Sequence, residues 1–599
     1  MFEPFRMKSA FTTAMTLALT VFVFPTESAR GEAPFDYAEA GKFWSFQPPQ
    51  PHPLAKVKQT DWPRKAIDHF VLARIEGAGI EPNSGADSRM LLRRASYALT
   101  GLPPNWEKMK GLTFEQQVED LLASPAFGER WARLWLDVAR YAEDQAHIVG
   151  NNSSLTYPNA YRYRDWVIDA LNRDLPYDDF IREQLAADLI SPEDEQRHFA
   201  LGFMGLGPKY YRRGDLAVMA DEWEDRVDTL TRGLLGLTVS CARCHDHFYD
   251  PIPTSDYYAL AGVFASTEMF NKPMVEECEM KPDGNTKKPD DADHLIREAK
   301  EMKNLPVYER GDVTAPGEEV QRGFLSVLGG GERVSFTSEN SGRLDLAEEI
   351  VDAENPLTAR VWVNRVWAEL FGQPLVSTTS NFGKLGEKPT HPELLDDLSY
   401  RFMQEGSWSL KWLVREIVLS ATWRQSSDLV TEKVNVDPTN ELLWRMKRRR
   451  LPVEMWRDSL FAVSGDLDRT VGGPSFSASD PEANRRAIYV AISRLQLDPM
   501  LALFDFPDPN LHSPKRDQTT TPIQKLFVMN HPLLVARGEA LAKELNGTPD
   551  ELVEKIYHLL FGRMPSEAEK DLGLKFLQQS TFADYAQALL ASNEFAWLD

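Results

Sequence analysis

The chain has 599 residues, of which 42% are hydrophobic and 26% charged, and fifteen are tryptophans, so it is a folded globular protein and not a disordered one. Its formal net charge of −23 excludes nucleic acid and anionic membrane surfaces as expected partners, because both are negatively charged themselves. Three cysteines are too few for a disulfide scaffold.

The N-terminus has the order of a secretory signal peptide. Arg6 and Lys8 precede an apolar run over 10–24, Pro25 ends the run, and small residues follow. The pattern predicts a cleaved signal peptide over 1–31 and a periplasmic or otherwise exported protein. The alternative is an uncleaved anchor, although the run is shorter than the roughly 20 residues that span a bilayer. After cleavage we expect no membrane span.

The next region, 35–270, has helical periodicity. Trp131, Leu134, Trp135 and Val138 recur at the spacing of one helix face, and 163–171 repeats the pattern. A length of 599 residues also favours two or three domains. We therefore predict a first helical domain over 35–270.

The segment 278–341 has a different character, because it is polar and rich in turn residues. Within it, the sequence predicts a short helix over 293–302 and a strand and turn over 306–313. From 343 to 599 the helical pattern returns, with helices predicted over 355–372, from His391-Pro392 onward, and over 408–420, 567–578 and 582–591. The predicted fold is mainly α, with two helical domains joined by an irregular segment that has a few short β-strands.

The most specific chemical feature is Cys241-Ala242-Arg243-Cys244-His245. This CxxCH pattern is typical of haem c, in which two cysteine sulfurs form thioethers with the porphyrin and the next histidine binds the iron. Cys241, Cys244 and His245 are therefore predicted to bind the cofactor, with His245 as the metal ligand. Catalytic residues are not indicated.

Other interpretations of the same residues remain open. A Cys-x-x-Cys pair is also found in disulfides and in zinc sites. The residues that follow, Asp246, His247 and Asp250, could join His245 as ligands of zinc or another divalent metal. Asp246 and Asp250 could instead cap the next turn.

Around this motif the sequence resembles the planctomycete cytochrome-like domain, a family of exported proteins of unknown function. The resemblance rests on residues 236–247 and on the flanking stretches 99–104, 129–133, 136–142, 161–167, 250–253 and 256–258. Residues 343–599 are similar to that family's usual C-terminal domain, also of unknown function, through 354–367, 381–383, 390–396, 448–451 and 504–509. The resemblance implies haem binding and a place beside sulfatase-like proteins, as redox component or partner, in a periplasmic polysaccharide pathway.

Three functions therefore remain open. The first is an exported haem c protein that transfers electrons to a redox partner or acts as an oxidoreductase. The second is a carbohydrate-active hydrolase or lyase with a divalent metal held by His245, His247 and Asp250. The third is a non-catalytic partner of a sulfatase-like protein. Separately, the arginine clusters 448–450 and 485–486 predict either an anion site or ion pairs with the many acidic residues.

Overall fold

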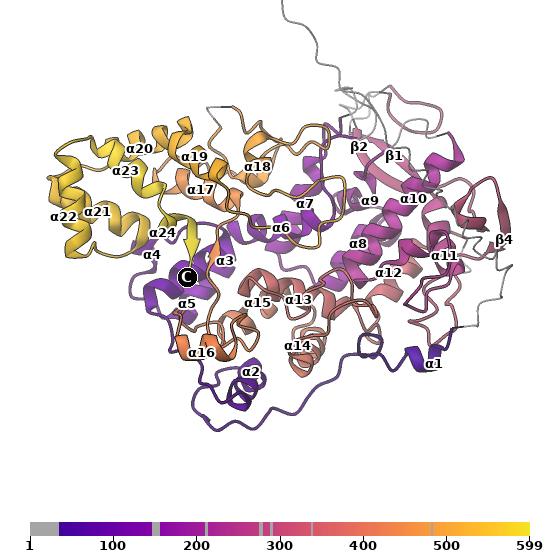
Figure 1. Cartoon of the computed structure of the whole chain (residues 1–599). Coiled ribbons are helices and arrows are strands. Elements are labelled where there is room, and N and C mark those ends of the chain that lie inside the picture. The colour runs from indigo at the N-terminus through magenta and orange to yellow at the C-terminus, as the bar shows by residue number, and fades with distance from the viewer. Residues whose placement is uncertain are drawn as a thin grey trace, which may run out of the picture. The chain divides into compact units, whose positions relative to one another are not determined.

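The computed structural model describes residues 35–145, 156–209, 214–274, 279–287, 292–336, 339–480 and 483–599 (Figure 1). These residues form a mainly helical structure with short antiparallel strands, which confirms the predicted fold class. The signal peptide predicted over 1–31 lies outside the described residues. In the part of the chain that is described, no helix is long and apolar enough to cross a membrane.

The helices of the first region follow the periodicity of the sequence. In α6 the predicted face is confirmed, since Trp131, Trp135 and Val138 are buried and Leu134 is partly buried. Side-chain caps fix helix starts, as where the Asp87 carboxylate accepts a hydrogen bond from the Met90 amide at the start of α3. The helices are α1 (Tyr37–Ala40), α2 (Ala66–Gly77), α3 (Ser88–Thr100), α4 (Trp106–Met109), α5 (Phe114–Leu122), α6 (Ala126–Val138), α7 (Tyr161–Asn172), α8 (Tyr177–Ile190), α9 (Gly202–Gly205), α10 (Leu216–Leu230) and α11 (Thr254–Ala265).

The middle of the chain forms two antiparallel strand pairs, β1 (Thr267–Pro273) with β2 (Ala292–Glu298) and β3 (Leu305–Tyr308) with β4 (Pro316–Val320). The strand predicted from residue 306 is confirmed. The short helix predicted over 293–302 is wrong, because β2 occupies most of this stretch. Pairing with β1 buries Leu295 and Ile296, and this tertiary contact overrides the local helical pattern.

The third region is helical, and its predicted helices are confirmed. Gly372 ends α13 with a φ of 74°, in the left-handed conformation that glycine adopts easily. A last short strand pair, β5 (Arg449–Arg450) with β6 (Trp597–Leu598), ties the C-terminus to the middle of the region. The helices are α12 (Arg343–Val351), α13 (Thr358–Phe371), α14 (Pro392–Gln404), α15 (Leu410–Val418), α16 (Thr431–Val436), α17 (Val453–Val463), α18 (Pro499–Leu503), α19 (Pro522–Asn530), α20 (Pro532–Glu544), α21 (Pro549–Phe561), α22 (Glu567–Leu577), α23 (Phe582–Leu590) and α24 (Asn593–Ala596).

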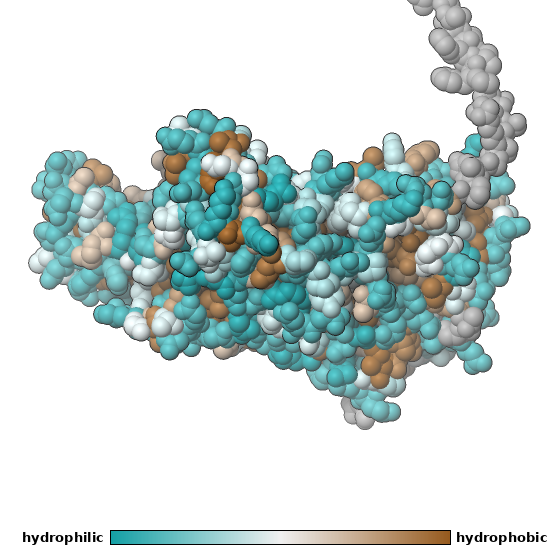
Figure 2. Space-filling model, turned by 90° about the horizontal axis from the view of Figure 1, so that it is seen from below, coloured by the Kyte–Doolittle hydropathy of each residue, from teal (hydrophilic) through white to brown (hydrophobic). Residues whose placement is uncertain are grey.

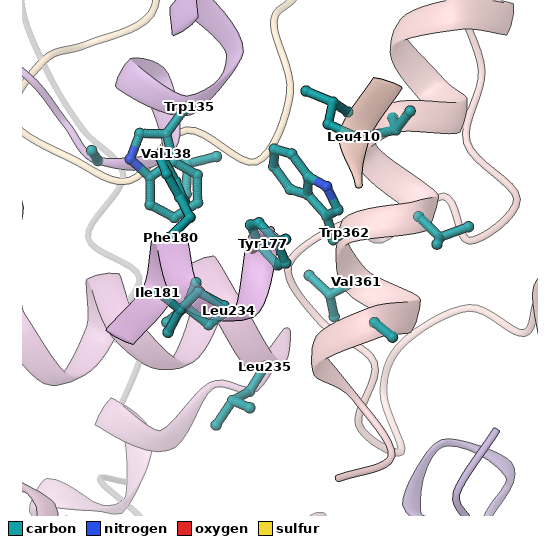
Figure 3. Packing of buried hydrophobic residues seen from close by; sticks show 14 of the residues in the cluster. Trp135, Val138, Tyr177, Phe180, Ile181, Leu234, Leu235, Val361, Trp362 and Leu410 are labelled. Carbon is teal, nitrogen blue, oxygen red and sulfur yellow. The ribbon is translucent and has the colours of Figure 1, made fainter. Parts of the chain in front are cut away.

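Both helical regions contribute to the largest hydrophobic core. Figure 3 shows Trp135 of α6 and Tyr177 of α8 facing Trp362 of α13. The Tyr177 and Trp362 rings stack with centroids 4.3 Å apart, and Trp135 meets Trp362 edge-on at 6.0 Å. Residues Tyr37–Asp599 accordingly form one compact unit. The face shown in Figure 2 is largely hydrophilic, with scattered apolar patches.

Candidate functional site

The CxxCH loop, defined as residues 239–250, follows directly from the end of α10. A π-helical turn, Thr231–Leu235, extends α10, and Gly236 then reverses the chain with a φ of 61°. A Cβ at Gly236 would lie 3.0 Å from Cδ2 of Phe382, so the glycine is required by both conformation and space. The short 3-10 helix Val239–Arg243 follows and carries the first cysteine.

Arg243, inside the motif, anchors the loop between α10 and α11. Its guanidinium pairs with Asp221 at 2.9 Å and also with Glu224, both on α10. The Tyr258 hydroxyl of α11 donates a hydrogen bond of 2.9 Å to the Arg243 carbonyl oxygen. The backbone that carries the two cysteines is therefore held from both sides.

Cys241 and Cys244 are exposed and carry free thiols. Cys241 and Cys244 are thus not joined by a disulfide bond in this structure. Cys278, the third cysteine, lies outside the described residues. Both sulfurs of the motif remain available to a ligand or to a covalent partner.

His245 is exposed, and its two ring nitrogens have different surroundings. Nδ1 lies 2.7 Å from the Asp246 carbonyl oxygen, so Nδ1 carries the proton and donates it. Nε2 then has a free lone pair. The ring packs on Phe248 at 4.1 Å between centroids, and Phe248 itself is 78% exposed. A metal-binding histidine needs this combination of a fixed tautomer and an open Nε2.

His247 is buried, and the protein already uses both of its nitrogens. Nδ1 accepts a hydrogen bond of 2.9 Å from the Asp250 amide, so Nε2 carries the proton and donates to the Thr238 hydroxyl at 3.0 Å. Burial lowers the pKa of His247, with His245 nearby adding to the effect of burial and Asp250 opposing it. His247 is therefore a neutral structural residue of the loop.

The two aspartates of the loop hold backbone groups. Asp246 accepts hydrogen bonds from the amide and hydroxyl of Thr254, at 2.7 and 3.0 Å, where α11 begins. Asp250 is buried and accepts a hydrogen bond of 2.7 Å from the Lys384 amide. A Cβ on Gly383 would lie 2.2 Å from the Asp250 carboxylate, so this contact depends on glycine.

The metal-binding alternative can be compared with these positions. The described residues contain no group of three or more His, Cys, Asp or Glu side chains placed to hold a metal ion. The divalent-metal set of His245, His247 and Asp250 is thus not assembled. The loop presents two exposed thiols separated by two residues and an adjacent histidine whose Nε2 is free.

The members of the two predicted arginine clusters, 448–450 and 485–486, lie in different surroundings in the structure. Arg449, Arg450 and Arg486 line a cavity, whereas Arg448 pairs with Asp599 at the surface. Arg485 donates to backbone carbonyl oxygens of a nearby loop. The sequence did not indicate that residues of α6 and α13 complete this cavity, since no local motif joins segments so far apart.

Comparison with known families finds two matches. Residues 66–269 match the family model PSCyt2, a protein of unknown function (DUF1549), and residues 342–577 match PSD1, a protein of unknown function (DUF1553). No curated protein and no solved structure matches the chain. The matches confirm the predicted pairing of two domains of unknown function, while haem binding stays a prediction. Two parts of the chain are therefore similar to planctomycete-type domains of unknown function, DUF1549 and DUF1553.

Proposed function

We propose that the protein is exported and carries one haem c, attached through Cys241 and Cys244 with His245 as an iron ligand. The observation that carries the proposal is the pair of exposed free thiols beside a histidine whose Nδ1 is committed and whose Nε2 is open. When bound, the haem would take up and release single electrons, which suits an electron-transfer component or an oxidoreductase.

Each part of the loop has a task in this proposal. Each cysteine S–H would add across one vinyl group of the porphyrin, which requires reduced and accessible thiols. The Asp246 carbonyl oxygen, as acceptor from Nδ1, would fix the His245 ring and raise the basicity of Nε2. The Arg243 contacts with Asp221 and Glu224 would hold the backbone of the motif in place.

Export is the second half of the proposal and rests on the N-terminal sequence pattern. Haem c is attached on the exported side of the membrane, so the two halves support each other. Cell fractionation and N-terminal sequencing of the mature protein test this half, with cleavage expected between residues 29 and 33. A chain recovered intact in the cytoplasm would contradict it.

The test of haem attachment is production of the full chain in a host with the attachment machinery. We expect haem staining on a denaturing gel and a stoichiometry of one haem per chain. Cys241→Ala and Cys244→Ala should each weaken the covalent stain, and the double variant should abolish it. His245→Asn should leave the stain but alter the visible spectrum, because the iron loses a ligand.

Two matched controls separate the motif from general effects. Cys278→Ser removes the remaining cysteine, and His558→Asn removes an exposed histidine far along the chain; both variants should keep haem and spectrum unchanged. A colourless protein would end the proposal. If that protein held stoichiometric zinc that is lost in the Cys241→Ala variant, the metal-dependent alternative would replace it.

A further inference from the structure

A cavity in the described part of the chain has no residue of the CxxCH loop in its lining. It has a volume of about 460 Å³ and is lined by side chains of α6, α13 and α17 and by the segments 447–452 and 513–518. This volume falls in the range of about 300–1,000 Å³ typical of small-molecule sites. Since α6 belongs to the DUF1549 match and the other elements to the DUF1553 match, both domains build its walls.

Charged side chains dominate the lining. Nine basic side chains and six carboxylates face the cavity, in a protein whose net charge is −23. Five of these carboxylates already have arginine partners. The pairs are Glu129 and Asp458 with Arg486, Glu369 with Arg130, and Asp137 and Glu454 with Arg516.

Two further arginines are paired, Arg133 with Asp137 and Arg450 with Asp505, and the four positive charges that remain have no such partner among the described residues. In the part of the chain that the structure describes, no carboxylate lies within 4.0 Å of the side-chain nitrogens of Arg365, Arg449, Lys447 or Lys515. Arg449 donates only to the backbone oxygen of Glu369. Arg365 donates to the carbonyl oxygens of 232 and 233 and to a serine hydroxyl. The cavity therefore holds an excess of cationic groups.

Among the described residues, two guanidinium nitrogens in the wall find no hydrogen-bond acceptor. They are Nε of Arg130 and Nε of Arg365, within side chains that are more than nine-tenths buried. A buried donor without an acceptor costs free energy, and an anionic oxygen would supply the missing acceptor.

Burial disfavours the charged form of the same groups. It is the main cause that lowers the pKa of Arg365 and of Arg449 to about 10, and Arg130 adds to the effect on Arg449. Both side chains are still cationic at neutral pH. An anion in the cavity would offset this repulsion and the loss of hydration.

We propose that this cavity is the binding site of a small organic anion with two or more carboxylate or sulfate groups. The charges explain the anion, and arginine provides paired donors that match planar oxyanions. The organic part is explained by the apolar side chains between the charges, Leu134, Val138, Ala368, Met455 and Ile488. The site uses no residue of the CxxCH loop, so it stands or falls independently of haem binding.

The test is isothermal titration of the full chain with two polyanions of different shape, benzene-1,2,4-tricarboxylate and citrate. The neutral triamide of the first compound and inorganic sulfate are the ligand controls. The variant Lys447→Gln/Arg449→Gln removes two of the unpaired charges, and Ala368→Phe fills the cavity without changing its charge. Lys110→Gln/Lys575→Gln removes two exposed lysines outside the cavity and is the matched control.

We expect saturable binding of at least one polyanion and none of the triamide. Binding should weaken about tenfold or more in the charge variant, as expected for lost charge-assisted hydrogen bonds, and should be lost in Ala368→Phe. The control pair should bind like the wild type, and thermal melts should show that all variants fold. The proposal is overturned if neither polyanion binds, if inorganic sulfate binds as tightly as both, or if the charge variant binds unchanged.

Discussion

The CxxCH loop and the arginine cavity differ in how their polar groups are buried and paired. The arginine cavity is the one lined by α6, α13, α17, 447–452 and 513–518. In the loop, Cys241, Cys244 and His245 are exposed, and His245 and Asp246 find their hydrogen-bond partners within ten residues, although Asp250 bonds the distant Lys384 amide. In the cavity, Arg486, Asp458 and Glu129 are buried, and Arg486 pairs with Glu129 across more than 300 residues of sequence.

Substitutions at the two sites should therefore change the free energy of unfolding by different amounts. Substitution of an exposed side chain of the loop should have little effect on the free energy of unfolding, because the fold does not depend on that side chain. Removal of one partner of a buried ion pair leaves the other charge without compensation, and folding then suffers. Substitutions of the exposed loop side chains should therefore change ligand binding but not the free energy of unfolding. Substitutions of the buried charges of the cavity should change the free energy of unfolding as well.

The largest effect is expected for Arg486→Gln. Arg486 donates to Asp458 at 2.7 Å, to Glu129 at 2.8 Å and to the Thr100 carbonyl oxygen at 3.0 Å, all buried. Its loss takes the closest cationic partner from two buried carboxylates, so urea unfolding should show a loss of about 3–5 kcal/mol. Arg448→Gln, at an exposed pair with Asp599, is the control and should cost at most about 1 kcal/mol. Equal losses in the two variants would erase the contrast between buried and exposed charges.

Gly383→Ala should have the next largest effect, because it acts where the loop is fixed to the second helical region. The new methyl group would meet the Asp250 carboxylate at 2.2 Å, and neither group can leave without breaking the bond to the Lys384 amide. We expect a loss of about 1–3 kcal/mol in unfolding free energy. Gly77→Ala, with open space around its Cβ, is the control and should be neutral or slightly stabilising. A neutral Gly383→Ala would show that the loop is not held there.

The same contrast explains what the sequence could predict. The ends of α13 follow from Pro356 before the helix and Gly372 after it, and the CxxCH motif is contiguous, so local patterns sufficed for both. Strand β2 was mistaken for a helix because its pairing with β1 is a tertiary contact that no local pattern records. Only part of the cavity lining could be predicted from the sequence. Arg449, Arg450 and Arg486 belong to arginine clusters of the sequence, but no local pattern places Arg130 and Glu369 beside them, because helix packing alone brings these residues together.

The pH dependence of stability tests one buried histidine beside the cavity. His512 donates from Nδ1 to the Val138 carbonyl oxygen at 3.1 Å and accepts at Nε2 from the Ser380 hydroxyl at 2.7 Å. Burial, with Arg365 adding to it, lowers the pKa of His512 to about 3. The unfolded state therefore binds the proton more readily, so this contribution to stability is complete above about pH 6.5 and is lost as the pH falls toward 3.

His512→Gln should make the acid-induced loss of stability shallower than in the wild type. Urea unfolding between pH 7 and 4.5 measures this as a difference in slope of at most one proton, about 1.4 kcal/mol per pH unit. His294 and His391 are also buried with a pKa of about 3 and contribute equally to both proteins, so they cancel in the comparison. Parallel pH profiles for the two proteins would mean that His512 does not resist protonation.

The smallest effect is expected for Phe248→Ala in the loop. The Phe248 side chain is 78% exposed and its ring contact is with His245, itself exposed. The free energy of unfolding of the haem-free protein should change by less than about 0.5 kcal/mol. In protein that carries haem, the same substitution should lower the thermal midpoint, because the ring beside the iron ligand is then missing. A cost above 1 kcal/mol without haem would make Phe248 part of the fold, and the loop would lose its distinction from the cavity.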